Sequence, residues 1–114
     1  MAVGDRTPTE IIAPAALSNA ATAKYTNSSA NRTQITGIWL CNTGATARTV
    51  ALYKNGTATA NMIASAIELP ANGSIFLDLA GKALIFTGTQ TLAAKQDTGT
   101  DVNIAAYGVV EQIA

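Results

Sequence analysis

The chain has 114 residues, enough for one domain with a single sheet-based core, and its seven basic and seven acidic residues give a net charge of zero. Charged residues make up only 12% of the sequence, so we expect no broad attraction for nucleic acid or for an anionic membrane. The lack of histidine and the single cysteine, Cys41, exclude histidine-based acid–base catalysis and His/Cys zinc sites within one chain.

A lone cysteine also forms no internal disulfide, which is compatible with a reducing cytoplasm. The N-terminal residues lack the basic and apolar regions of a signal peptide, and no apolar run approaches the about 18 residues of a membrane span. We therefore expect a protein that is made in the cytoplasm and has no membrane partner.

The first 15 residues differ from the rest because they contain Pro8 and Pro14 and show no clear period. Proline resists helix formation, so an extended segment is expected. Ile11 and Ile12 are apolar enough to dock on the parent domain or on a neighbouring subunit, and a partly frayed terminus is the alternative. We predict an extended N-terminal arm over residues 1–15 and one folded domain over residues 16–114.

From residue 16 onward, short β-rich segments alternate with turn signals at intervals of roughly 8–12 residues, as in a sandwich or small barrel. Asn55-Gly56 and Asn72-Gly73 supply residues that tolerate the positive φ angles of tight turns. Residues 58–66 could instead form one short helical turn, which is the one alternative to β structure in this part of the chain. The fold expected is all-β, a single antiparallel, jelly-roll-like β-sandwich of about eight short strands at residues 21–26, 33–42, 47–54, 64–69, 74–79, 83–87, 90–96 and 101–112.

Alternation along these strands separates their two faces, because successive side chains point to opposite sides of a sheet. With the aliphatic residues assigned to the core, three large aromatic residues fall on outer faces: Trp39, Tyr53 and Tyr107. Interfaces are enriched in such residues. A strand buried on both faces would instead make Trp39 an ordinary core residue. The candidate interface residues are Ile11, Ile12, Trp39, Tyr53 and Tyr107.

Catalytic and metal-binding motifs lack the context that they need. Asp97-Thr98-Gly99 matches the aspartic-protease triplet, but polar residues precede it and only a short stretch follows, so a hairpin loop is the expectation. Asp97 and Asp101 lack the further oxygens of a calcium loop. We therefore predict no catalytic, cofactor-binding or metal-ligating residue, and a protein that is not an enzyme.

Four segments together resemble small β-sandwich virion proteins of tailed bacteriophages: residues 38–44 (IWLCNTG), 47–53 (ARTVALY), 67–79 (IELPANGSIFLDL) and 102–109 (VNIAAYGV). The resemblance implies a capsid decoration, or cement, protein that is assembled in the host cytoplasm and located in the virion. It implies the major capsid protein or another virion protein as partner, and we expect a homo-oligomer, with a homotrimer favoured. The alternative is a tail- or fibre-associated module that binds a host receptor or carbohydrate through exposed aromatic residues.

Overall fold

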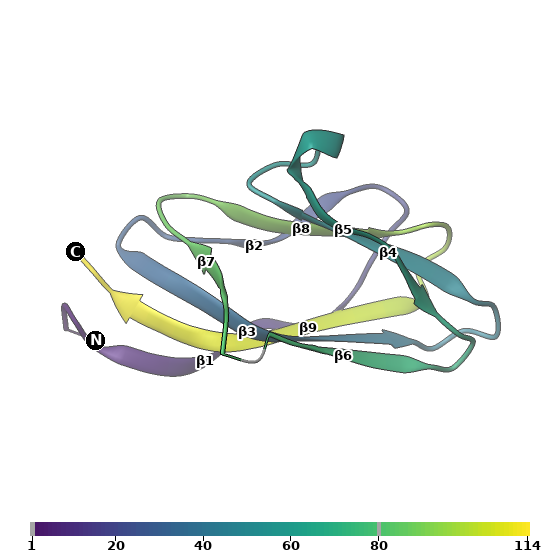
Figure 1. The fold of residues 1–114 in the computed structure, drawn as a ribbon, viewed down its shortest axis with the longest axis horizontal. Helices are drawn as coiled ribbons and strands as arrows, with labels where there is room; N and C mark the ends of the chain where they lie inside the picture. The colour runs from purple at the N-terminus through teal and green to yellow at the C-terminus, as the bar shows by residue number, and fades with distance from the viewer. Residues whose placement is uncertain (1, 80) are drawn as a thin grey trace.

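The computed structural model describes residues 2–79 and 81–114, which form two antiparallel sheets packed face to face (Figure 1). None of the described residues forms a helix long and apolar enough to cross a membrane. The elements are β1 (Arg6–Ala16), β2 (Thr22–Thr26), β3 (Asn31–Asn42), β4 (Arg48–Lys54), a 3-10 turn η1 (Thr59–Asn61), β5 (Met62–Leu69), β6 (Ser74–Asp78), β7 (Leu84–Phe86), β8 (Thr91–Gln96) and β9 (Val102–Gln112).

The strand order confirms the predicted jelly-roll-like sandwich. The first sheet has the order β1-β9-β3-β6, with β7 also paired to β3, and the second has the order β2-β8-β4-β5. The chain passes repeatedly between the sheets, so strands adjacent in sequence mostly lie in different layers, as in a double-sheet jelly roll. The eight predicted strands correspond to β2 through β9, and the short turn considered within 58–66 is η1.

The segment expected to be an arm is the edge strand β1. It pairs antiparallel with β9 from Arg6 opposite Glu111 to Ala16 opposite Asn103. Ile12 is 4% exposed and belongs to the core. Of the alternatives open for this segment, docking on the parent domain is the one observed, and the expected boundary at residue 15 lies inside a strand. Pro8 and Pro14 are tolerated because an edge strand forms a ladder on one side only.

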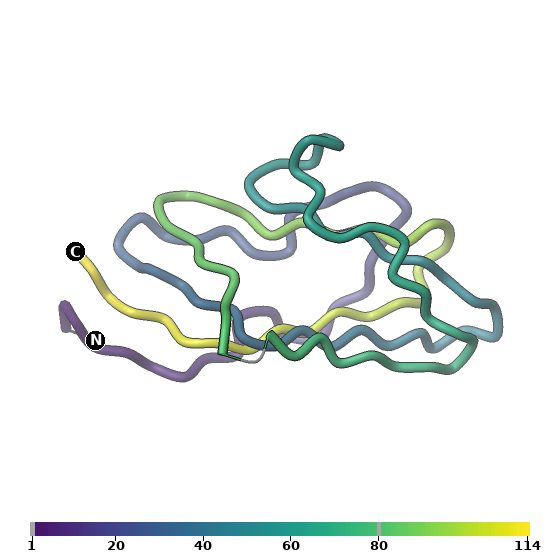
Figure 2. The backbone as a smooth tube through the Cα atoms, in the orientation of Figure 1, coloured from purple at the N-terminus to yellow at the C-terminus, as the bar shows by residue number. Residues whose placement is uncertain are grey.

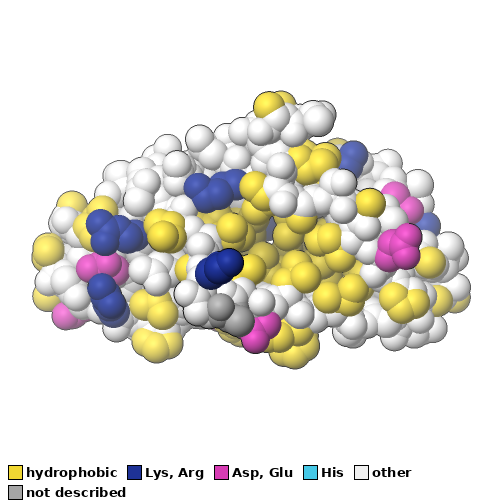
Figure 3. Space-filling view, in the orientation of Figure 1, with side chains coloured by type: hydrophobic (Ala, Val, Ile, Leu, Met, Phe, Trp, Pro, Cys, Tyr) yellow, Lys and Arg dark blue, Asp and Glu magenta, His cyan; other side chains and the backbone are white. Residues whose placement is uncertain are grey.

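The core lies between the two sheets and is made of aliphatic residues from both layers. The backbone path in Figure 2 shows the layers as separate runs of chain, with both termini at one end of a molecule 46 Å long. Between β5 and the β6–β7 edge the sandwich is open, and apolar atoms are visible there at the surface (Figure 3). This shallow opening has a volume of about 540 Å³, and Leu77 and Leu84 in its wall are only half-buried.

The exposed edges of both sheets are short or irregular. The pairing of β1 with β9 shifts register twice, between Glu10 and Ile12 and between Ile12 and Ala15. The other long edge strand, β5, is interrupted where Ser65 and Ala66 lie opposite a single residue of β4. Bulges and prolines make an edge a poor template for a further strand. These edges are therefore protected against pairing with another chain.

Ala66 adopts a left-handed conformation at this bulge, with φ of 53°. Such a conformation is costly for any residue that carries a Cβ atom. We expect Ala66→Gly to raise the free energy of unfolding by about 0.5–1 kcal/mol, because the relieved strain exceeds the entropic cost of glycine. Thermal unfolding measures the effect. Ala64→Gly, in the same strand but without a positive φ, is the control and should lower stability; a lower melting temperature for Ala66→Gly would contradict the bulge.

Candidate functional site

Four large apolar side chains lie exposed on the outer surface of the first sheet and form what we call the aromatic face. Their exposed fractions are 45% for Trp39, 43% for Phe76, 40% for Tyr107 and 50% for Ile85. They come from four different strands, β3, β6, β9 and β7. β3 pairs with each of the other three strands, and all four side chains line one groove on this sheet surface. Ile85 lies opposite Gln34, five residues along β3 from Trp39.

The geometry of the aromatic face follows from strand register. Trp39 and Phe76 are direct cross-strand partners, and their rings stack with centroids 4.2 Å apart and planes inclined by 29°. Tyr107 lies opposite Gly37, two residues along β3 from Trp39 and so on the same face of the sheet. A Cβ atom at Gly37 would stand 2.7 Å from the Phe76 ring, so this glycine makes room for the ring to lie over the strand. The rings therefore support one another and are held in place before any partner binds.

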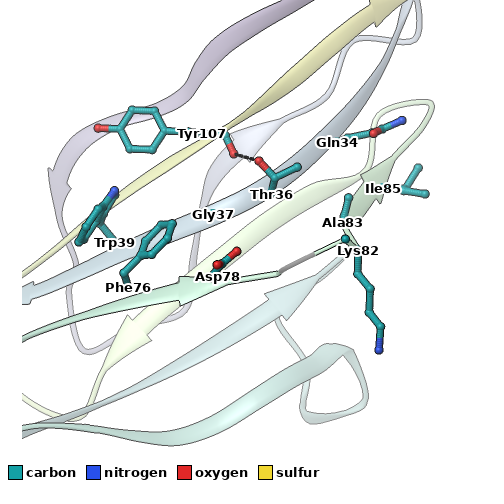
Figure 4. Close-up of a pocket in the computed structure, with 11 residues that line it drawn as sticks. Gln34, Thr36, Gly37, Trp39, Phe76, Asp78, Lys82, Ala83, Ile85 and Tyr107 are labelled. Carbon is teal, nitrogen blue, oxygen red and sulfur yellow. Dashed lines mark hydrogen bonds between the residues drawn. The ribbon is translucent and has the colours of Figure 1, made fainter.

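A groove of about 680 Å³ runs beside the Phe76 ring, and its lining mixes apolar and polar groups (Figure 4). Gln34, Thr36, Asp78 and Lys82 contribute the polar side chains. The hydroxyl of Thr36 donates a hydrogen bond of 3.5 Å to the carbonyl oxygen of Tyr107. The groove is thus wide, shallow and electrically balanced.

The predicted interface residues divide into two groups. Trp39 and Tyr107 lie exposed on the aromatic face. Ile12 is buried in the core, and Ile11 is half-buried against it. Their side chains stabilise the sandwich and offer little surface to a partner, which corrects their prediction as interface residues.

Tyr53 also requires a correction, because it is only 3% exposed. Alternation places it correctly on the side of β4 opposite the core. There it packs with Ala51 and Ala93 in a small second cluster, against which Ala21 and Met62 are partly buried. These neighbours cover the ring, and Tyr53 is not an exposed contact residue.

Sequence reasoning missed Phe76 and Ile85. Residues 75–77 are all apolar, so hydrophobicity alone does not select the inward side. The sequence did contain a signal for Phe76. It lies two residues from each of the polar residues Ser74 and Asp78, so all three side chains point to the same side of the strand, which indicates the solvent side.

Sugar sites usually place Asp, Asn or Arg side chains beside their aromatic residues, and three residues of this kind lie on or next to β3, β4 and β9: Asn42, Arg48 and Asn103. Two of them are engaged elsewhere. Asn42 is buried, and its amide donates to the carbonyl oxygen of Thr46 at 2.8 Å. Arg48 pairs with Asp101. Asn103 alone of these three lies beside Trp39 and Tyr107.

The Asp97–Asp101 segment is the loop that joins β8 to β9. The expected hairpin is wrong, because these two strands lie in different sheets and the loop crosses between them. The carboxylate of Asp97 accepts a hydrogen bond of 2.9 Å from the backbone N–H of Thr98. Gln96, fully buried, accepts one of 2.7 Å from the backbone N–H of Val102 and donates one of 2.9 Å to Asp101. Among the described residues, no group of three His, Cys, Asp or Glu side chains could hold a metal ion. The loop has a structural role.

Asp101 connects this loop to β4. The Nε of Arg48 donates to both carboxylate oxygens, at 3.0 and 3.3 Å. This hydrogen bond, with a further one from Gln96, holds the pKa of Asp101 below its usual value of 3.8.

We expect acid to weaken the fold through this pair. Because the pKa of Asp101 is lower in the folded chain than in the unfolded chain, its contribution to stability is present above pH 3.8 and is lost as the pH falls through the folded-state pKa. Urea unfolding as a function of pH measures the effect. Asp101→Asn should show a shallower loss of stability in acid than the parent chain; parallel curves would contradict a role for this carboxylate.

Comparisons with known proteins establish the fold and no family. Searches found no matching family model and no matching curated protein. The chain is similar to one solved structure, which is described as "Bacillus endospore appendages form a novel family of disulfide-linked pili". The alignment covers 99% of this chain and 93% of the other, with a TM-score of 0.56 and 11% sequence identity. At this identity the likeness shows a shared sandwich fold alone.

Proposed function

We propose that this chain is a structural subunit of a multi-copy assembly and that the aromatic face is its contact surface. The observation that carries the proposal is the exposure, by 40–50%, of Trp39, Phe76, Tyr107 and Ile85 on one sheet surface. Large apolar side chains that are exposed together on one surface mark interaction sites on soluble proteins, and Trp and Tyr are over-represented among residues that dominate binding energy.

The sheet edges support a contact through a face. The two longest edge strands, β1 and β5, carry prolines or bulges. Strand addition requires an uninterrupted row of backbone groups. Stacked rings on a flat sheet surface need no such row, so burial of the aromatic face is the favoured mode of association.

The single cysteine bears on how subunits are held together. The similar structure is described in terms of disulfide-linked pili. A continuous disulfide-linked chain needs at least two cysteines in each subunit, whereas Cys41 is the one cysteine in these 114 residues. The assembly proposed here is therefore not a continuous disulfide-linked chain, and it depends on buried area and repetition of the contact.

In its more specific form, the proposal is a decoration protein of a tailed-phage capsid, bound as a homotrimer to the major capsid protein. The resemblance of residues 38–44 and 102–109 to phage virion proteins supports this form. Those two segments supply Trp39 and Tyr107, so the resemblance and the aromatic face involve the same strands, β3 and β9.

Co-sedimentation with phage capsids that lack the protein tests the proposal. We expect Trp39→Ala and Tyr107→Ala each to weaken binding by roughly 30-fold, since dominant interface residues contribute about 2 kcal/mol or more. Ile63→Ala is the matched control, because Ile63 is also 45% exposed but lies on β5 of the second sheet. Equal binding by all three variants would show that the aromatic face is not the contact surface.

A carbohydrate-binding tail module is the second candidate, favoured by the polar side chains beside the stacked rings, Gln34, Thr36 and Asp78. Sugars stack their C–H faces on aromatic rings while their hydroxyls bond to such groups. Trp39 is the only tryptophan, so its fluorescence reports directly on this site. A saturable change on titration with oligosaccharides from the host surface, together with no capsid binding, would favour this candidate over the first.

A further inference from the structure

The chain contains two Asn-Gly pairs in closely similar local settings. Asn55 and Asn72 both adopt the left-handed conformation, with φ of 60° and 56°, and both are exposed. Each is followed by a glycine, whose lack of a side chain leaves its backbone nitrogen open to attack the preceding amide. The pairs are therefore equal in sequence and in the conformation of the asparagine.

They differ in the state of the glycine nitrogen. The N–H of Gly73 donates a hydrogen bond of 3.0 Å to the carbonyl oxygen of Pro70. The N–H of Gly56 has no hydrogen-bond acceptor within residues 2–79 and 81–114. A nitrogen whose proton is held by a carbonyl must first break that bond before it loses the proton and turns toward a side chain.

The surrounding chain adds to the difference. The turn at residues 70–73 joins β5 to β6 and so links the two sheets, and its Asn72 N–H donates to the carbonyl oxygen of Gly44 at 2.9 Å. Asn55 begins a longer loop between two strands of one sheet, and this loop projects from the sandwich at η1 (Figure 1). The backbone N–H of Asn55 donates a hydrogen bond of 2.8 Å to the carbonyl oxygen of Thr91, and the side-chain amide of Asn61 donates one of 3.1 Å to the carbonyl oxygen of Asn55. These bonds fix Asn55 but leave the nitrogen of the following glycine without an acceptor among the described residues.

We propose that Asn55 is a site of spontaneous deamidation in the folded protein and that the fold protects Asn72. The backbone nitrogen of Gly56 loses its proton and bonds to the side-chain carbonyl carbon of Asn55. The bond from that carbon to the amide nitrogen breaks, and ammonia leaves with the proton. Water then opens the cyclic imide at either carbonyl, which gives aspartate or isoaspartate at residue 55.

The modification changes both charge and local structure. A chain with a net charge of zero gains one negative charge. Isoaspartate also lengthens the backbone by one carbon between residues 55 and 56, where the carbonyl oxygen of Asn55 accepts its bond from Asn61. The loop that leads through η1 to Met62, one of the residues packed against Tyr53, is then displaced.

Peptide mass spectrometry on the full-length chain tests the proposal. The folded protein is incubated in H₂¹⁸O at mildly alkaline pH, so that each imide that opens takes up one heavy oxygen, and the labelled fractions at residues 55 and 72 are followed over time. A parallel incubation in concentrated guanidinium, where neither turn is formed, gives the rate ratio that is due to sequence alone.

We expect the ratio of the rate at Asn55 to the rate at Asn72 to be at least roughly fivefold higher in the folded chain than in guanidinium, the factor given by one additional hydrogen bond to break. A ratio that is equal in the two conditions, or lower in the folded chain, would overturn the proposal. Ion-exchange chromatography of the aged protein should also yield a species with one added negative charge, whose modification maps to residue 55.

Discussion

Replacing Gly108 with alanine is expected to destabilise the folded chain severely. Gly108 lies in the middle of β9, opposite Ile35 of β3. A Cβ atom at this position would overlap the carbonyl oxygen of Gln34 and would lie 2.9 Å from the Cα atom of Ile35. Both obstacles are backbone atoms of a central strand, so the clash is relieved only by separating β3 from β9.

The expected loss is about 4 kcal/mol or more, a large part of the 5–15 kcal/mol by which domains are usually stable. Circular dichroism and the yield of soluble protein measure it. Gly37→Ala is the control, because its added Cβ atom meets only the Phe76 ring, which rotates away at a cost of about 1–3 kcal/mol. If the two variants were equally stable, the close approach of β9 to β3 at Gly108 would be disproved.

Phe86→Ala is expected to cost about 3–5 kcal/mol, as for other fully buried aromatic residues. Phe86 is fully buried and meets the ring of Tyr25 edge to face, with centroids 5.8 Å apart. The ammonium group of Lys54 lies 5.0 Å from the Phe86 ring centroid. Removal of the Phe86 ring also loosens Tyr25, whose hydroxyl is 2.6 Å from the hydroxyl of Thr33 in a buried polar cluster.

Phe76→Ala is the matched control, since it deletes the same side chain from a position that is 43% exposed. Chemical denaturation should show a loss of less than about 1.5 kcal/mol for this variant, the additional stacking value of an aromatic pair. Equal losses at the two phenylalanines would contradict the assignment of one to the core and the other to the surface.

The strands from β2 to β9 could be predicted because the local sequence of a half-buried strand alternates polar and apolar residues and is bounded by turn residues. The pairing of β1 could not. Pro8 and Pro14 remove the usual signals of a strand, and the partner, β9, lies almost a whole chain length away. Only tertiary contact fixes the position of such a segment, and docking on the parent domain was one of several outcomes consistent with the sequence.

The candidate site was predicted in part for the same reason. Alternation gives the side of a sheet to which a residue points, and it placed Trp39 and Tyr107 correctly. It does not say what lies above that side. Tyr53 points away from the core as expected, yet Met62 and Ala21 cover it. Phe76 is the opposite case, an apolar residue within an apolar run that nevertheless faces outward.

A cryo-electron microscopy reconstruction of a particle that carries this protein tests the central proposal most directly. We expect Trp39 and Tyr107, both exposed in the single chain, to be covered by a neighbouring subunit, with the first sheet turned toward the assembly. A map in which the aromatic face looks onto solvent, while the second sheet or the strand edges make the contacts, would contradict it.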